Sequence, residues 1–232
     1  MGLSISVATG LYGLSFGALA VAAGLTVWQS MALSVLMFTG GSQFAFIGVI
    51  AGGGAASAAV GAATLLGVRN AVYGMQMNRL LAPTGWRQWL AAHVIIDESA
   101  ATAVGQSAPD EQQRGFWTAG IGVFVLWNLF TLLGAWLGDA LGDPRRWGLD
   151  GAAVAAFLGL LWPRLQQREP VALALVCGVA TAVAVPLLPP GLPILLAAVV
   201  GAAWGWWVRS PDADTAAVVQ RQTSAATGKA TP

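Results

Sequence analysis

An arginine lies inside an apolar stretch of the chain, where a charge is costly. Arg69 falls in the apolar run 55–78, about eight residues or about 12 Å of helix from its end. A central arginine costs about 2.5–3.5 kcal/mol on insertion scales, so we expect it to face protein. Asn70 adds a second polar group, and Tyr73 lies one turn further on the same helical face. These side chains could hold the carboxylate of a bound solute or that of an acidic residue of the chain, and both interpretations remain open.

A pair of glycines interrupts the preceding apolar run, 28–51. Gly40 and Gly41 are followed by the polar residues Ser42 and Gln43 near its middle. Adjacent glycines weaken a helix, and a broken helix at membrane depth is tolerated only where it faces protein or a wet cavity. A half-helix starting there would expose N–H groups that can bind an anion. The alternative is a groove of small residues that serves helix packing alone.

Three titratable residues follow within a short stretch. His93 and Asp97 are four residues apart and share a helical face, whereas Glu98 points about 100° away. Acidic groups in or near a membrane often relay protons, so these residues predict proton coupling, with Asp97 as the first choice. The alternatives are a solvated helix whose charges face water and an ion pair between Asp97 and Arg69.

One catalytic motif occurs in an unsuitable context. Gly13-Leu-Ser-Phe-Gly17 matches G-x-S-x-G, in which Ser15 would be the nucleophile, but that motif requires a strand–turn–helix and here lies within an apolar span. We therefore expect its glycines to pack helices, and a membrane hydrolase using Ser15 is a minor alternative. The sequence has no P-loop, one histidine and one cysteine, Cys177, so we expect neither enzyme activity, a cofactor, a metal site nor an internal disulfide.

Composition predicts the elements that must position these residues. Only 9% of the 232 residues are charged and 56% are hydrophobic, whereas soluble domains carry about 25% charged residues, so the expected solvent is lipid. The net charge of +1 gives no reason to expect a nucleic-acid partner. An all-α, polytopic membrane helix bundle is predicted. Its apolar segments lie at about 5–24, 28–51, 55–78, 116–138, 151–163, 170–187 and 190–208.

The number of spans depends on a weaker apolar segment at about 89–105, which contains the three titratable residues. If it does not cross the bilayer, seven spans remain, and a cytoplasmic C-terminus places most loop arginines in the cytoplasm. If it crosses, there are eight spans and this bias weakens. The positive-inside rule therefore favours seven spans with the N-terminus outside.

The two halves of the chain share a faint repeat. Three positions recur with the same spacing: Trp28, Phe38 and Gly40 in the first half, and Trp147, Phe157 and Gly159 in the second. Because transporters are often built from repeated halves, two inverted three-helix repeats with a broken second helix are predicted within a transmembrane domain of residues 1–209. Residues 210–232 are polar and small, and we predict a disordered tail.

Four blocks of residues together resemble a known family. They are Gly13-Leu-Ser-Phe-Gly-Ala-Leu-Ala20, Phe38-Thr-Gly-Gly-Ser-Gln-Phe44, Val68-Arg-Asn-Ala-Val-Tyr73 and His93-Val-Ile-Ile-Asp-Glu-Ser99. Their order and spacing resemble the AzlC family, the large subunits of bacterial branched-chain amino acid exporters, with weaker similarity onward to about residue 208. One departure is Gly67, where the family commonly has asparagine; Asn70 offers a replacement amide.

The resemblance implies export of leucine, isoleucine, valine and also methionine across the bacterial plasma membrane. It further implies drive by the proton motive force and a second, small membrane subunit of the AzlD type. The residues themselves suggest that the solute is bound by the Gly40–Gln43 segment with Arg69, Asn70 and Tyr73. A transporter of another small carboxylate or amine is the alternative.

Overall fold

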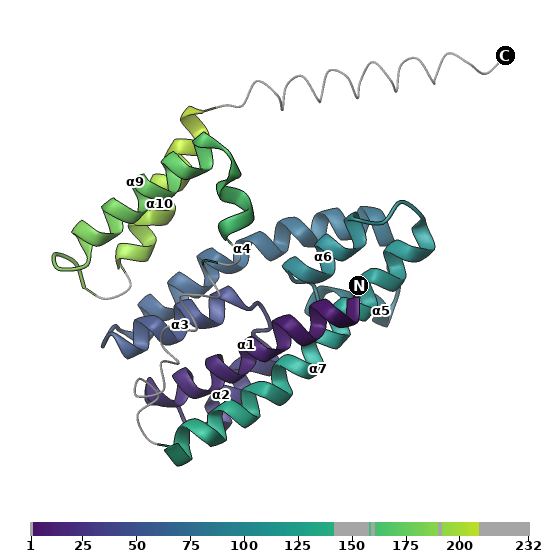
Figure 1. Ribbon diagram of the computed structural model, residues 1–232, viewed down its shortest axis with the longest axis horizontal. Helices are drawn as coiled ribbons and strands as arrows, with labels where there is room; N and C mark the ends of the chain where they lie inside the picture. Colours follow the sequence, from purple (N-terminus) through teal and green to yellow (C-terminus); the bar gives the residue numbers. More distant parts are fainter. Residues whose placement is uncertain (1, 142–157, 159–160, 190–191, 209–232) are drawn as a thin grey trace.

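The computed structural model describes residues 2–141, 158, 161–189 and 192–208, and every regular element in these ranges is helical, as predicted. Figure 1 shows α1 to α7 gathered together, with α9 and α10 as a separate pair at one side that reaches the others through a small contact of α10 with α4. The elements in chain order are α1 (Gly2–Ala22), α2 (Val27–Leu36), α3 (Gly41–Ala51), α4 (Ala56–Leu81), α5 (Trp86–His93), α6 (Asp97–Val104), α7 (Pro109–Leu141), the 3₁₀ helix η2 (Trp162–Gln166), α9 (Arg168–Ala184) and α10 (Leu192–Trp207).

Two of the described helices are long and apolar enough to cross a bilayer by themselves, α1 and α7. The 21 residues of α1 correspond to about 31 Å of helix, which matches a hydrocarbon core of about 30 Å. Helix α4 is also long, with 26 residues, but it carries the polar pair Arg69 and Asn70. Most of the predicted segment 151–163, the second copy of the repeat and the tail 210–232 lie outside the described residues.

Two of the predicted apolar segments are each divided into two short helices. The segment 28–51 forms α2 and α3, separated at Met37–Gly40, where Gly40 has a φ of +62°. The break therefore lies slightly earlier than predicted, and Gly41, Ser42 and Gln43 form the first turn of α3. The segment 89–105 is not one helix either, because α5 and α6 are separated at Val94–Ile96.

Helices α1 and α7 lie side by side, and glycines bring their backbones into contact (Figure 1). Five glycines lie where a Cβ would clash with or press on the backbone of the facing helix: Gly10, Gly13 and Gly17 of α1, and Gly134 and Gly138 of α7. A Cβ on Gly13, for example, would come within 2.5 Å of the Trp127 carbonyl oxygen. Small residues spaced by one turn permit this approach between membrane helices. The G-x-S-x-G motif is therefore a packing motif in a continuous helix, and Ser15 is buried there.

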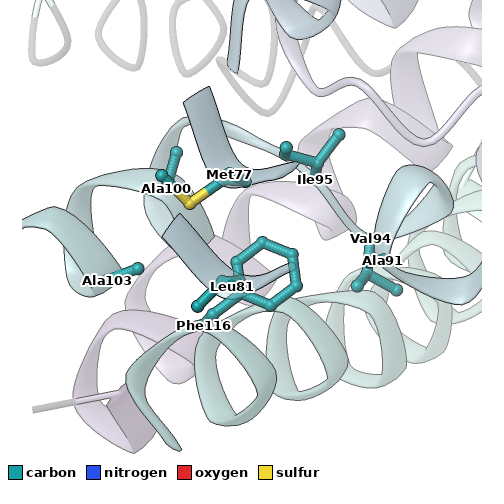
Figure 2. Close-up of a cluster of buried hydrophobic side chains, with 8 residues drawn as sticks. All are labelled: Met77, Leu81, Ala91, Val94, Ile95, Ala100, Ala103 and Phe116. Atoms are coloured by element: carbon teal, nitrogen blue, oxygen red, sulfur yellow. The ribbon is translucent and has the colours of Figure 1, made fainter. Parts of the chain in front are cut away.

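A cluster of buried apolar side chains fixes the second break against the rest of the bundle. Met77 and Leu81 near the end of α4 pack with Val94 and Ile95 of the break and with Phe116 of α7. Figure 2 shows these side chains gathered around the Phe116 ring. The contact determines where the α5–α6 break meets α4.

The α1–α7 contact can be tested at Gly134. A Cβ there would collide with the backbone of Leu14, so Gly134→Ala is expected to destabilise the protein by about 1–3 kcal/mol, as overpacking does. Thermal unfolding of the detergent-solubilised protein measures the change. Gly61→Ala on α4 is the matched control, because a Cβ there meets nothing within 4 Å and alanine favours helix by up to about 1 kcal/mol. Equal unfolding temperatures for both variants would contradict this account of the interface.

Candidate functional site

Neighbouring residues of α4 bind the backbone at both helix breaks. Arg69 donates from Nη2 to the carbonyl oxygen of Thr39, in the α2–α3 break, at 3.1 Å. Asn70 donates from Nδ2 to the carbonyl oxygen of Ile95, in the α5–α6 break, at 3.0 Å. A broken helix leaves carbonyls without helical partners, and at membrane depth such groups must be satisfied by protein. Two adjacent polar residues of α4 thus satisfy carbonyl groups in two different helix breaks.

The guanidinium of Arg69 also forms an ion pair. Its Nη1 lies 2.6 Å from Oδ2 of Asp97, the first residue of α6. The two side chains are 34% and 22% exposed, so the pair is largely withdrawn from the surface. The 2.6 Å between Nη1 and Oδ2 is short, as is typical of a charge-assisted hydrogen bond. Of the two interpretations left open for Arg69, the internal ion pair is present in the structure.

The start of α6 is held by its own serine. Ser99 Oγ accepts a hydrogen bond from the Ile96 N–H at 3.0 Å and lies 3.0 Å from the Val94 carbonyl oxygen, to which it can donate. The first turn of α6 carries Asp97 and Glu98, whose negative charge suits the positive end of the helix. The first turn of α3 has no acidic residue, so its positive end is not compensated in this way.

A cavity of about 80 Å³ lies where these elements meet. The two breaks contribute to it together with α1, α4 and α7. Its polar wall is formed by Thr9, Thr39, Arg69, Asp97 and Glu98, and the start of α3 reaches it through Gly40 and Gly41. Its apolar wall is formed by Phe38, Phe44, Ile96, Val123 and the ring of Trp127, with Tyr12 also at the lining.

Several buried polar atoms around this cavity have no hydrogen-bond partner among the described residues. They include a donor, Nε1 of Trp127, and two oxygens, Oδ1 of Asp97 and Oγ1 of Thr39. Trp127 is only 3% exposed, and its ring stacks on Phe16 at a centroid distance of 6.0 Å. Buried polar groups in proteins are normally hydrogen-bonded, and an unpaired one calls for an explanation such as a bound ligand.

The structure brings five of the sequence-predicted site residues to the cavity lining. These are Gly40, Gly41, Arg69, Asp97 and Glu98. Glu98 lies next to Asp97 but has a different partner, since Oε1 accepts a hydrogen bond from the Thr9 hydroxyl of α1 at 3.3 Å. Residues predicted separately for solute binding and for proton handling therefore share one cavity.

The other predicted site residues lie outside that lining. Gln43 is fully buried and donates from Nε2 to the carbonyl oxygen of Leu33 at 3.2 Å, which ties α3 to the end of α2. Asn70 supports the second break, and Tyr73 packs against the apolar cluster of Figure 2. Ser42 is buried near Gly67, with Oγ 3.6 Å from where a Cβ on that glycine would lie. The ring of His93 packs against Phe38 and Phe124.

The sequence did not predict the other residues of the cavity lining. Thr9, Tyr12 and Trp127 come from α1 and α7, which read as uniform apolar spans. The glycine spacing on α1 marked its packing face, but it did not indicate that Thr9 would meet the start of α6. That contact joins residues 89 positions apart and depends on the tertiary arrangement.

The apolar helices, their broken segments and a charged cluster at the centre of the bundle are the features of a membrane-embedded transport protein. Residues 4–141 match the family described as AzlC protein. The match covers more than half of the chain, and the chain belongs to the AzlC family. It is accordingly a membrane protein and a transporter component. Neither the curated proteins nor the solved structures that were compared gave a match.

The role of the ion pair can be tested by removing one partner and then both. Asp97→Asn leaves the Arg69 charge without its partner, and we expect a loss of about 1–3 kcal/mol, below the roughly 3–5 kcal/mol for a fully buried pair because both side chains are partly exposed. The double variant Arg69→Gln with Asp97→Asn removes the stranded charge and should regain part of that stability. Thermal unfolding in detergent measures both, with Asp139→Asn at an exposed position as the control. Equal unfolding temperatures for the single and double variants would contradict the ion-pair role.

Proposed function

We propose that this protein exports small hydrophobic L-amino acids, namely leucine, isoleucine, valine and also methionine, driven by the proton motive force. Membership of the AzlC family supports the proposal, since this is a transporter family. The observation that carries it is the cavity itself, whose lining residues include an unpaired donor, Nε1 of Trp127, unpaired oxygens of Asp97 and Thr39, and several apolar side chains. A zwitterion with an apolar side chain needs this combination.

The cavity suggests how such a solute would be oriented. Its α-ammonium group fits next to Asp97, whose Oδ1 is an unpaired acceptor. Its α-carboxylate fits at the uncompensated start of α3, beside Gly41, with Arg69 and the Trp127 Nε1 donor nearby. Its side chain would then contact the apolar wall. Both charged ends of the amino acid are recognised in this pose.

The size of the cavity fits a closed state of a transporter. A volume of about 80 Å³ is well below the roughly 300–1,000 Å³ of typical small-molecule sites. A whole branched-chain amino acid needs more room, so binding requires the walls to move apart. Broken helices near the bilayer midplane are the usual place for such movement in secondary transporters.

Two alternatives make different demands on the same site. A transporter of another small carboxylate or amine would need to bind only one charged group of its solute, whereas an amino acid has two. A membrane hydrolase would need Ser15 at a reactive position, whereas Ser15 is buried in α1 within the glycine interface to α7. The presence of both an unpaired donor and an unpaired acceptor among the lining residues favours an amino acid over either alternative.

Counterflow in proteoliposomes tests the proposal directly. Labelled leucine is expected to exchange with unlabelled leucine, isoleucine, valine and methionine, but not with lysine or glutamate. Leucinamide lacks the carboxylate and 4-methyl-2-oxopentanoate lacks the ammonium group, so neither should compete well. Competition by the oxo acid as strong as that by leucine would indicate a carboxylate transporter, and equally strong competition by leucinamide would indicate an amine transporter.

A variant of the same assay tests the proposed carboxylate contact. Trp127→Phe keeps an aromatic ring but removes the Nε1 donor, so the KM for leucine should rise about tenfold or more, since hydrogen bonds to charged groups contribute about 1.5–3 kcal/mol. Trp136→Phe is the matched control, because Trp136 lies on the same helix and is 63% exposed. An unchanged KM in Trp127→Phe would remove this residue from the substrate site.

The proposal includes a small AzlD-type membrane subunit and a place in the bacterial plasma membrane with the C-terminus in the cytoplasm. Membership of the family motivates the partner. Cells that express this chain alone should export little leucine, and cells that express both chains should export it against a gradient. Full export by the purified chain alone in proteoliposomes would contradict a two-subunit transporter.

A further inference from the structure

The cavity wall contains two neighbouring carboxylates whose surroundings differ. Asp97 is bound to the Arg69 guanidinium at 2.6 Å. Glu98 is bound by a neutral group, the Thr9 hydroxyl at 3.3 Å, and forms no salt bridge with any cation in the described part of the chain. The two acids are consecutive in sequence, so this difference comes from the elements that each one faces.

The balance of charge distinguishes them further. The titratable and charged groups facing the cavity are Tyr12 from α1, Arg69 from α4, and Asp97 and Glu98 from α6; α7 contributes only Val123 and Trp127. One guanidinium and two ionised carboxylates leave one uncompensated negative charge in a poorly hydrated site, which is costly. A single proton removes that charge. Because Asp97 is paired with the Arg69 guanidinium and Glu98 has no cationic partner, the proton is better placed on Glu98.

We propose that Glu98, not Asp97 or His93, is the residue that takes up and releases the coupling proton. The inference rests on the proposed function as a proton-driven exporter. His93 is less suited, because its ring packs between aromatic residues and it is not part of the cavity lining. Asp97 then serves as the fixed partner of Arg69, and Thr9 positions the Glu98 carboxyl.

The position of Glu98 gives a reason for the coupling. When Glu98 is ionised, the polar wall is negative and favours the α-ammonium group of the solute next to Asp97. A proton entering from the outer side binds the Glu98 carboxylate, removes this charge and weakens the hold on the ammonium group. The proton then leaves to the cytoplasm while the solute stays outside, which makes the exchange an antiport. The Thr9 hydroxyl can donate to the ionised carboxyl and accept from the protonated one.

The experiment compares exchange with uphill transport in proteoliposomes that contain the exporter complex. In Glu98→Gln, which resembles the protonated residue, exchange at saturating leucine should persist with a raised KM and no longer depend on pH. Transport driven by a pH gradient should fall to the level of protein-free liposomes. Glu111→Gln, at an exposed position in the first turn of α7, is the matched control and should retain gradient-driven transport.

A second variant tests the same idea without removing the carboxyl. Thr9→Val takes away the hydroxyl that donates to ionised Glu98, so the pH of half-maximal transport should move upward by about one unit. A Thr9 that is merely structural would lower the rate without moving the pH profile. This variant also decides the question if Glu98→Gln does not fold.

The outcomes separate the inference from the proposed function. If wild-type protein shows no saturable amino-acid exchange, the proposed function fails. If wild-type protein exchanges leucine but Glu98→Gln still accumulates it in a pH gradient, the assignment of the proton to Glu98 is wrong. Loss of exchange in a Glu98→Gln protein that unfolds like wild type also overturns the assignment, since Glu98 would then serve binding or structure.

Discussion

The arrangement depends on one constraint: a helix that is interrupted in an apolar environment needs partners for its free backbone groups. Arg69 and Asn70 supply such partners at two interruptions, because each donates a hydrogen bond to a carbonyl oxygen of a different break. An unsatisfied group of this kind costs several kcal/mol in lipid, so neither break is independent of α4. The ion pair to Asp97 adds a third link from the same two residues and brings the first turn of α6 to the cavity.

The local sequence was informative wherever a residue type conflicted with its surroundings. Arg69 within an apolar run correctly indicated a contact inside the protein, and the glycine pair correctly indicated a broken second helix. The all-α architecture followed from composition. The G-x-S-x-G motif was correctly assigned to packing, because its context excluded the strand–turn–helix that catalysis would require.

The remaining features depend on contacts between distant residues. Gln43 is polar and lies near the break, which suggested solute binding, but its amide binds the last carbonyls of α2 instead. The segment 89–105 appeared continuous because Val94, Ile95 and Ile96 are apolar and contain no helix breaker. Its break is stabilised by the Ser99 hydroxyl and by Asn70 of another helix. Nothing in the two long apolar helices predicted that they would form one wall of the cavity.

The close contact of α1 and α7 has a mechanical consequence. Each glycine there leaves a notch that receives the backbone of the other helix, and a shift of one residue, about 1.5 Å, would press side chains into backbone. The notches therefore resist sliding of one helix along the other. The lining residues Thr9, Tyr12, Val123 and Trp127 all lie on these two helices, so the proposed opening of the cavity would leave their mutual distances unchanged. In the proposed transport cycle, expansion is left to the segments at the two helix breaks, which join short helices.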